Sequence, residues 1–472
     1  MTCMFFRAAM AGTIGLASTA FGGAMTAADI DDLLARMTVA EKAGQMTQLS
    51  VSMLIDGEET PGSPWTISDE KLRDIVVNHG VGSLFGVWHG PLSVERWRGL
   101  VERIQDLAVE ETRLGIPVVF AQDSVHGANY LIDGTIFPHN LNMAATWDPG
   151  LGVEVGRVTA IETRACGTHW NFSPVADVMR QPMWSRVFET FGEDPLLAGT
   201  MAAGVIRGME DDGLASDTAV AATVKHFLGY PAPLSGKDRT PAYIAPTQLH
   251  DIHLPSFRMA FEAGAETVMI NSGEINGVPV HADPRILIDL LRGELGFEGV
   301  AVTDRGDINK LVDVHRVAAD KKEAARMAIE AGVDMSMVAQ ETSFTTNVIE
   351  LVEEGRLSET TLDRSVRRIL KLKSDLGLFD EPVSGASSVD LIGSDEHHAL
   401  SARAARDGLV LLRNEGGVLP IAEGSKILVT GPTSDDLVPL HGSWTYSWQG
   451  HERGWYPELP TVADALRKRF GE

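Results

Sequence analysis

Eight short apolar segments recur along the chain, and stretches with helical apolar spacing separate them. In those stretches apolar residues return every three or four positions, as in Leu362, Val366 and Ile369, which predicts amphipathic helices. Eight alternations of strand and helix are typical of a closed parallel barrel, although an open doubly wound sheet gives the same local pattern. The eight expected strands are Gln45 to Leu49, Val81 to Val87, Val118 to Ala121, Trp170 to Val175, Ala221 to His226, Thr267 to Asn271, Val300 to Asp304, and Val333 to Met337.

The positions of the polar residues favour the barrel. In a parallel barrel the carboxyl ends of all strands meet at one mouth, where active sites are built. Polar residues lie at or just after the ends of most of the expected strands: Trp88, His89, Gln122, Asp123, Asp177, Lys225, His226, Asn271 and Asp304. We therefore expect a TIM-barrel-like (β/α)8 domain with a polar pocket at its mouth.

Net charge and composition exclude several classes of protein. The 65 acidic and 40 basic residues give a formal charge of −25, which argues against a protein that binds nucleic acid or anionic membranes. Hydrophobic residues make up 44% and charged residues 22% of the chain, as in an ordinary globular protein. Only Cys3 and Cys166 are present, and we expect Cys166 to be buried and inert.

The chain divides into four predicted parts. Residues 1–27 resemble a cleaved secretory signal, with Arg7 before an apolar, small-residue stretch, so we expect a periplasmic or secreted protein without an intrachain disulfide. Residues 28–383 form the barrel-like catalytic domain, and 384–404 a linker and helix within a region rich in Pro, Gly and Ser. Residues 405–472, with apolar runs at 408–412 and 426–431, are expected to begin an α/β sandwich domain.

Several strand ends carry residues that could perform chemistry. Asp304 ends the run Gly299-Val-Ala-Val-Thr-Asp, although an Asp in this place is often only the N-cap of the next helix. Asp123 ends another strand, and Lys225 and His226 end a third, where the two side chains could point to opposite faces. Together with Arg186, these cations would lower the pKa of a nearby carboxyl group, which suits a nucleophile better than a general acid.

Other types of site lack their sequence signals. The sequence shows no paired Cys or His-Glu-x-x-His spacing for a metal, no phosphate-binding loop or nucleotide fingerprint, and no Gly-x-Ser-x-Gly nucleophile elbow. We therefore predict no metal and no cofactor. Trp444 and Trp448 lie in Gly442-Ser-Trp-Thr-Tyr-Ser-Trp-Gln-Gly450, which indicates a loop whose indoles either stack on sugar rings or pack in the core.

Taken together, these motifs resemble glycoside hydrolase family 3, the β-glucosidase and exo-β-glucanase group. They run in the family's order over nearly the whole chain after the predicted signal. The matching stretches are Ala121-Gln-Asp-Ser-Val-His-Gly127, Trp184-Ser-Arg-Val-Phe-Glu-Thr-Phe-Gly-Glu-Asp-Pro195, Lys225-His-Phe227, Ile275-Asn-Gly-Val-Pro279, Gly299 to Asp304, Ala331-Gly-Val-Asp-Met335, and Trp444 to Gly450.

The resemblance implies a barrel-like domain followed by an α/β sandwich, with the catalytic pocket between them. It implies a retaining, exo-acting β-glucosidase that acts on β-glucosides or short β-glucans without a cofactor. Asp304 matches the nucleophile, and Trp448 matches an aromatic wall around the next sugar. Four further residues match groups that bind the sugar at the cleaved bond: Asp123, Arg186, Lys225 and His226.

The sequence departs from the family pattern in three places. The family's acid/base Glu follows the Trp-Gln-Gly motif in the second domain, and the sequence reaches Glu472 without a corresponding motif. Arg305 follows the nucleophile where the glucosidases commonly have Trp, and Ser272 stands where many members have Tyr. Two alternatives therefore stay open: a glucan-binding protein without catalysis, and the family's β-N-acetylglucosaminidase branch, whose second His is missing from Lys225-His-Phe-Leu-Gly-Tyr230.

Overall fold

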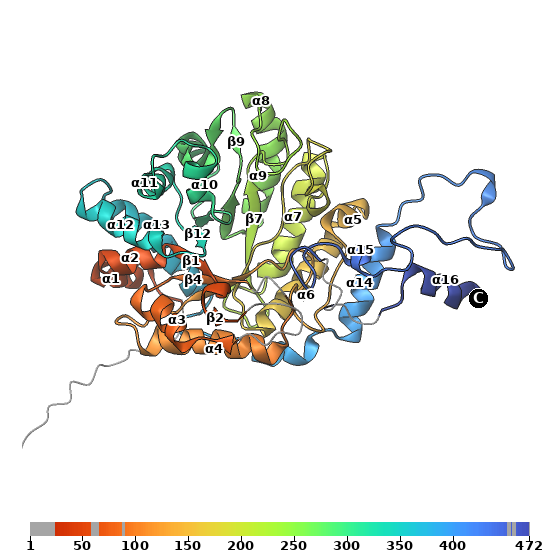
Figure 1. The fold of residues 1–472 in the computed structure, drawn as a ribbon, viewed down its shortest axis with the longest axis horizontal. Coiled ribbons are helices and arrows are strands. Elements are labelled where there is room, and N and C mark those ends of the chain that lie inside the picture. The colour runs from red at the N-terminus through yellow and green to blue at the C-terminus, as the bar shows by residue number, and fades with distance from the viewer. Residues whose placement is uncertain (1–23, 58–65, 87–89, 451–454, 456–458, 472) are drawn as a thin grey trace, which may run out of the picture.

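A computed structural model describes residues 24–57, 66–86, 90–450, 455 and 459–471 (Figure 1). Most of the predicted signal, together with Cys3, Trp88 and His89, lies outside the described residues. The first helix, α1 (Ala27–Arg36), begins at a capping box in which Thr26 and Asp29 bond reciprocally to each other's backbone N–H. No helix among the described residues is both long enough and apolar enough to cross a bilayer.

Eight parallel strands form a nearly closed barrel, which confirms the barrel and rejects the open doubly wound sheet (Figure 1). Their hydrogen-bonded order is β11-β8-β7-β6-β5-β4-β1-β12, and a single parallel bridge from Val302 to Met335 joins the two ends. All eight predicted strands are present, with shifted bounds: β1 (Thr47–Ser50), β4 (Ser83–Phe85), β5 (Val119–Gln122), β6 (Trp170–Asn171), β7 (Ala221–Phe227), β8 (Thr267–Ile270), β11 (Val300–Val302) and β12 (Ser336–Ala339).

Helices surround the barrel because each has one apolar face to bury. In α13 (Glu359–Asp375), Leu362, Val366 and Ile369 are fully buried, as their spacing predicts. The other helices around the barrel are α2 (Val39–Gln45), α3 (Asp69–Arg73), α4 (Val94–Glu110), α5 (Asn140–Ala145), α6 (Pro149–Ala165), α7 (Pro195–Glu210), α8 (Pro246–Gln248), α9 (Leu254–Glu262), α10 (Asp307–Asp313), α11 (Lys321–Ala331) and α12 (Ser343–Glu353).

Shorter elements lie within the barrel domain and in the segments after it. Two small antiparallel pairs join β2 (Ile55–Asp56) to β3 (Thr66–Ile67) and β9 (Glu274–Ile275) to β10 (Val278–Pro279). The π-helical turns are η2 (Asp74–Asn78), η4 (Leu249–His253) and η6 (Arg285–Glu294), and the 3-10 turns are η1 (Val51–Met53), η3 (Val187–Glu189), η5 (Val280–Ala282), η7 (Ala386–Leu391) and η8 (Glu415–Gly417).

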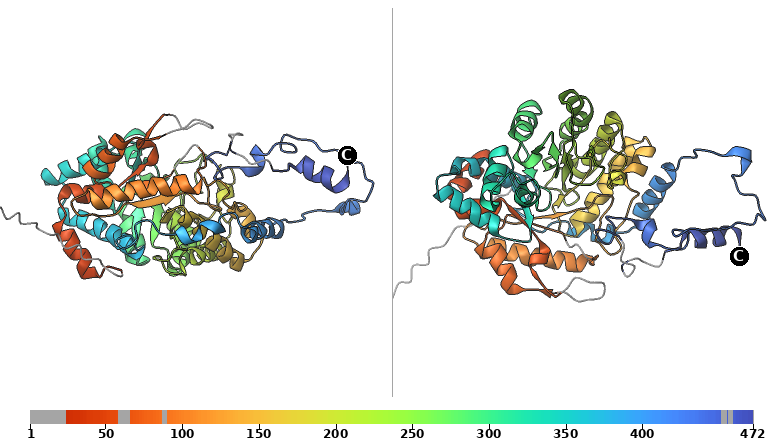
Figure 2. Two further views of the ribbon diagram at one scale, coloured as in Figure 1. Left: turned by 90° about the horizontal axis from the view of Figure 1, so that it is seen from below. Right: turned by 45° about the horizontal axis from the view of Figure 1, so that its top comes forward.

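The C-terminal part leaves the barrel and then returns to it (Figures 1 and 2). Helix α14 (Asp395–Asp407) confirms the predicted helix after the linker. Residues 408–437 follow as an extended excursion in which no strand forms, although the apolar runs at 408–412 and 426–431 were expected to start an α/β unit. A strand requires a hydrogen-bonding partner, and the described residues supply none here. The sandwich domain and the four-part division therefore stay predictions.

Beyond this excursion the chain forms α15 (Val438–His441), a loop over the barrel mouth, and α16 (Val462–Phe470). The loop, residues 442–450, contacts the barrel through its backbone. Tyr130 N–H donates to the Thr445 carbonyl at 2.8 Å, and His126 Nε2 lies 3.1 Å from the Ser443 carbonyl. Loop 442–450 is thus fixed against the barrel by residues that follow β5.

Candidate active site

One cavity of 440 Å³ lies at the mouth of the barrel, beneath loop 442–450. It contains all six predicted site residues, which come from five separate stretches of sequence: Asp123, Arg186, Lys225, His226, Asp304 and Trp448. The remaining lining residues are Ser185, Phe188, Glu189, Asp238, Arg239, Met269, Arg305, Lys310, Ser443, Trp444 and Gln449. Converging strand ends supply Asp123, Lys225, His226 and Asp304, as expected for a barrel, and loops add Arg186 and Trp448.

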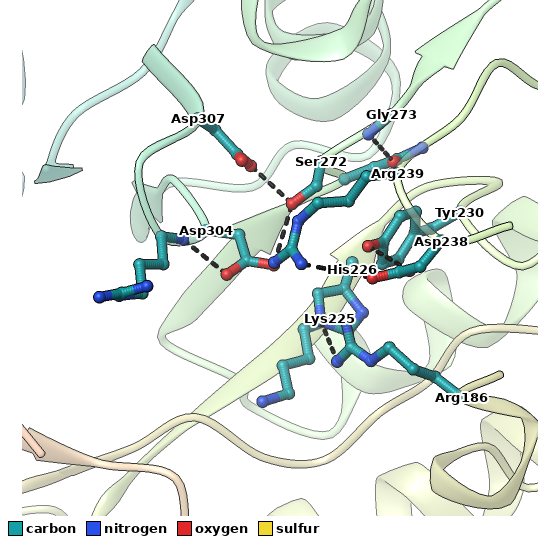
Figure 3. Close-up of polar contacts among 12 residues, drawn as sticks. Arg186, Lys225, His226, Tyr230, Asp238, Arg239, Ser272, Gly273, Asp304 and Asp307 are labelled. Carbon is teal, nitrogen blue, oxygen red and sulfur yellow. Dashed lines mark hydrogen bonds and ion pairs between the residues drawn. The ribbon is translucent and has the colours of Figure 1, made fainter. Parts of the chain in front are cut away.

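Asp304 lines this cavity and makes several polar contacts (Figure 3). Its Oδ2 accepts hydrogen bonds from Arg239 Nη2 at 3.1 Å and from Ser272 Oγ at 2.9 Å, and its Oδ1 accepts one from Arg305 N–H at 2.6 Å. Burial alone would raise the pKa of Asp304, but Arg239 and the other surrounding cations hold that pKa well below its usual value. The carboxylate is therefore ionised at neutral pH.

Asp304 is not the cap of the following helix. Helix α10 begins at Asp307 after Gly306, which has a left-handed φ of 71°, and no side chain caps it. The bonds of Asp304 instead reach across the cavity to Arg239 and Ser272 (Figure 3). The N-cap alternative is therefore wrong.

Lys225 and His226 both reach the cavity, so the alternative that they point to opposite faces is wrong as well. Lys225 Nζ donates to Asp123 Oδ1 at 2.9 Å and lies 5.4 Å from the centre of the Trp444 ring. Burial raises the pKa of Asp123, and the ion pair with Lys225 opposes that rise. The pair presents adjacent donor and acceptor groups, as the binding of a sugar hydroxyl requires.

His226 is held as a neutral imidazole. Burial and the charge of Arg186 keep its pKa well below the ordinary value. Its Nδ1 lies 2.7 Å from Asp177 Oδ2, and its Nε2 lies 3.0 Å from Arg186 Nη2. Because the guanidinium can only donate, Nε2 is the acceptor and Nδ1 carries the proton. Asp177, predicted at the mouth, thus lies fully buried behind His226.

Arg186 is oriented by Glu189, which the sequence analysis did not select as a site residue. The two form a bidentate ion pair, with Nε 2.9 Å from Oε1 and Nη2 2.7 Å from Oε2. Glu189 Oε1 also accepts the Trp444 indole N–H at 3.0 Å. One buried carboxylate thereby connects a substrate-binding candidate of the barrel with loop 442–450.

The two tryptophans of this loop differ. Trp444 is 7% exposed, whereas Trp448 is 37% exposed and presents its side chain to the cavity. The segment is a loop, as its Gly and Ser residues predict. The stacking interpretation fits Trp448, whereas Trp444 packs as a buried wall beneath Lys225.

Asp238 and Arg239 were also missed by sequence reasoning. Asp238 accepts hydrogen bonds from Trp184 Nε1 at 2.9 Å and Tyr230 Oη at 2.6 Å, and Arg239 contacts both Asp238 and Asp304 (Figure 3). Their only sequence signal is the charged triplet Lys237-Asp-Arg in a loop rich in Gly, Pro and Ser. Such a triplet usually marks a solvated turn, so only the fold reveals its direction.

Some polar residues of the expected strand ends and of the matching stretches serve the scaffold. Asn271 Nδ2 donates to the Leu228 carbonyl at 2.8 Å, and His126 lies between the Phe137 and Ser443 carbonyls. Gln122 is buried and outside the cavity lining. Cys166 is buried, and burial raises the pKa of its thiol, as expected for an inert residue.

The family model and the similar proteins all indicate the same family. Residues 38–372 match the family model described as "Glycosyl hydrolase family 3 N terminal domain". The chain is 40% identical to the lysosomal beta glucosidase of Dictyostelium discoideum, over 93% of this chain and 55% of that protein. It is 34% identical to the periplasmic beta-glucosidase of Salmonella typhimurium, over 88% and 52%, and 33% identical to a beta-xylosidase of Formosa agariphila, over 79% and 53%. The chain spans about half the length of these curated relatives.

Solved structures of similar proteins superpose on this chain. The exo-1,3/1,4-beta-glucanase of a Pseudoalteromonas species superposes with a TM-score of 0.84 at 30% identity, covering 94% of this chain and 55% of that one. A beta-glucosidase of Listeria innocua in complex with laminaribiose superposes with a TM-score of 0.81 at 31% identity, covering 94% and 59%.

Proposed function

Because the chain belongs to glycoside hydrolase family 3, we propose that it is a retaining, exo-acting β-glucosidase that removes terminal glucosyl residues from β-glucosides or short β-glucans. The observation that carries this proposal is the ionised Asp304, which lies among hydrogen-bond donors in the barrel-mouth cavity. Relatives named as β-glucosidases, and a related structure with laminaribiose, support glucose as the sugar.

In this mechanism Asp304 attacks the anomeric carbon and forms a covalent glycosyl-enzyme, which water then hydrolyses. Asp123, Lys225, Arg186 and His226 bind the hydroxyl groups of the terminal sugar. Their mutual bonds already fix their orientation, so the site does not have to order them during the reaction. Trp448 and Arg305, which also line the cavity, contact the leaving group.

Retention also requires an acid/base carboxyl about 5 to 5.5 Å from the nucleophile. Among the described residues of the cavity, the other carboxylates are already paired: Asp123 with Lys225, Glu189 with Arg186, and Asp238 with Arg239. We assign none of them as the acid/base. Where such a carboxyl is lacking, activated aryl glucosides should be hydrolysed in strong preference to disaccharides, because only their leaving groups depart without a proton. The ratio of the two rates therefore measures whether an acid/base group acts in the site.

The nucleophile can be tested by covalent trapping. A fluorinated, slow-reacting dinitrophenyl glucoside should label Asp304, and peptide mass spectrometry should locate the label there. Asp304→Asn should abolish labelling and reduce hydrolysis of aryl glucosides by roughly 1,000-fold or more, because covalent catalysis is lost. Labelling of another side chain, or full activity of the variant, would overturn the proposal.

The sugar specificity requires a direct comparison, since relatives of this chain include β-xylosidases. Matched nitrophenyl β-glucoside, β-xyloside and β-N-acetylglucosaminide assays distinguish the candidates. We expect the glucoside to have the highest kcat/KM. Calorimetric binding of glucan oligosaccharides without product release would instead indicate a binding protein.

Residues 1–27 support a proposal of export to the periplasm or beyond. Relatives named as periplasmic agree with it. Mass determination of the secreted polypeptide would locate the N-terminus, and retention of residues 1–20 would contradict the proposal.

A further inference from the structure

The Ser272 hydroxyl lies between the carboxylates of Asp304 and the buried Asp307 (Figure 3). Its Oγ is 2.9 Å from Asp304 Oδ2 and 2.6 Å from Asp307 Oδ2. Ser272 is 1% exposed and Asp307 2% exposed, so solvent does not replace either bond. A hydroxyl has a single proton and donates to only one carboxylate at a time. The two carboxylates therefore share one donor.

The bonds of Asp304 show which of its oxygens is available. A carboxylate offers about four lone-pair positions, two on each oxygen. Those on Oδ2 are taken by Arg239 Nη2 and Ser272 Oγ, whereas Oδ1 accepts one hydrogen bond from the described residues, from the Arg305 backbone N–H. With respect to the described residues, the remaining position is on Oδ1.

We propose that Ser272 is a positioning residue for the nucleophile: its hydroxyl, shared with Asp307, holds Oδ2 of Asp304 so that Oδ1 attacks the sugar. This inference rests on the proposed glycosidase function. The Oδ1 lone pair forms the bond to C1 while the bond from C1 to the leaving oxygen breaks, and that oxygen keeps the electron pair. A dinitrophenolate leaving group needs no proton, so the step balances with the groups present.

The Ser272 hydroxyl proton, shared between the two carboxylates, also explains how the site accommodates the loss of negative charge on Asp304. When Asp304 becomes an ester, its oxygens are weaker acceptors, and the Ser272 hydroxyl can turn to the Asp307 carboxyl group. Asp307 is held in place by Lys310 Nζ at 2.5 Å, and His281 Nε2 lies 3.4 Å from its Oδ2. Burial lowers the pKa of His281 to about 4, so its charge does not change above about pH 5.

Several charged or titratable groups face Asp304 and Asp307, and these groups must be left unchanged in every variant used for the test. They come from every element packed around Asp304 and Asp307: Asp123, Arg186, Glu189, Lys225, His226, Tyr230, Asp238, Arg239, His281, Arg305 and Lys310. The test therefore changes only Ser272 and Asp307.

The test is the rate of covalent labelling by the fluorinated dinitrophenyl glucoside as a function of pH, using the whole chain. The acid limb of this profile is the fall in labelling rate at low pH as Asp304 becomes protonated. Ser272→Ala should slow labelling about tenfold or more and move the acid limb up by about one pH unit, because the ionised Asp304 carboxylate loses a donor. The matched control is Ser365→Ala, which removes another buried hydroxyl that donates to a carboxylate at 2.9 Å, Asp334, away from the cavity. It should leave both the rate and the limb unchanged.

A double-mutant cycle tests the sharing itself. Asp307→Asn replaces the competing carboxylate by a neutral, weaker acceptor, so it should move the acid limb to lower pH by more when Ser272 is present than in the Ser272→Ala background. Equal shifts in both backgrounds would mean that Asp307 acts through its charge alone, which would overturn the sharing.

The remaining outcomes separate this inference from the proposed function. Labelling of Ser272→Ala at the original rate and pH limb, with the label on Asp304, would overturn the positioning role and leave the glycosidase proposal standing. Slower labelling with an unmoved limb would show a merely structural effect and also overturn it. If the unmodified chain were labelled elsewhere or not at all, the proposed function itself would fail.

Discussion

At the scale of single residues, Glu189 connects the barrel with the loop above it. It binds Arg186 through both oxygens and accepts the Trp444 indole N–H. Glu189 is 2% exposed, so each bond is made away from water and a lost partner is not replaced. The orientation of a sugar-binding candidate and the position of loop 442–450 therefore depend on the same carboxylate.

We expect Glu189→Gln to weaken the binding of glucose-like inhibitors by about tenfold, because Arg186 loses its charged partner. The same change should increase hydrogen exchange in loop 442–450, since the Trp444 anchor weakens. Calorimetry and exchange mass spectrometry measure the two effects. Glu193→Gln, at an exposed position nearby, serves as the control, and unchanged binding and exchange in Glu189→Gln would refute the connection.

A second residue-scale prediction concerns Lys373, which is fully buried in α13 and donates to the Pro117 carbonyl at 2.7 Å. Burial lowers its pKa from 10.5 to about 7. Between these two values the unfolded chain holds a proton that the folded chain lacks, so folded stability rises with pH across that window, by up to about 1.4 kcal/mol per pH unit.

Lys373→Met lacks this titration. The difference in melting temperature, variant minus unmodified chain, should therefore be highest at pH 7 and decrease steadily toward pH 9. The control Lys371→Met removes a half-exposed lysine whose pKa is raised by its carboxylate neighbours, and it should show no such trend. A pH-independent difference for Lys373→Met would mean that the buried amine keeps its ordinary pKa.

At the scale of elements, helix α14 is attached to α6 by one carboxylate with several donors. Glu162 Oε1 accepts hydrogen bonds from Thr135 Oγ1 at 2.7 Å and Gly393 N–H at 3.0 Å, and it lies 2.7 Å from His397 Nδ1. Its Oε2 accepts Thr135 N–H at 2.6 Å. Glu162 is fully buried, so α14 and the segment before it depend on this group.

Glu162→Gln places an N–H where one of these donors points, and we expect it to destabilise the attachment by about 3 kcal/mol. Hydrogen exchange across 386–407 should increase more than in the barrel strands. Glu154→Gln, which also removes an α6 carboxylate paired with α14, is the matched control; its exposed bond to Arg403 should contribute less than about 1 kcal/mol. Equal effects of the two changes would contradict the prediction.

At the scale of the whole molecule, the excursion at 408–437 extends away from the barrel (Figure 2), and several of its apolar side chains are exposed. Leu412 is 91% and Leu428 88% exposed. Extended apolar segments without a strand partner favour association between copies of a chain. The chain should therefore self-associate at high concentration.

Replacing Leu412 and Leu428 together by Lys should shift sedimentation profiles toward the monomer. Replacing Leu234 by Lys, at a barrel position that is 72% exposed, should leave the profiles unchanged. A monomer at all concentrations for the unmodified chain would show that the excursion is covered in another way.

The amino-acid sequence by itself determined the eight alternations of strand and helix, because their period and apolarity are local properties, and the polar strand ends favoured a barrel over an open sheet. The tertiary structure decided that the sheet nearly closes. The sequence's strand ends pointed to Asp304, Asp123, Lys225 and His226, since such residues meet where a parallel barrel closes, whereas Arg186 and Trp448 lie in loops and were selected from their motifs and the family resemblance. Only the tertiary structure revealed Glu189, Arg239 and the shared hydroxyl of Ser272. Their importance depends on the distance between groups that lie far apart in the chain, and no local pattern specifies that distance.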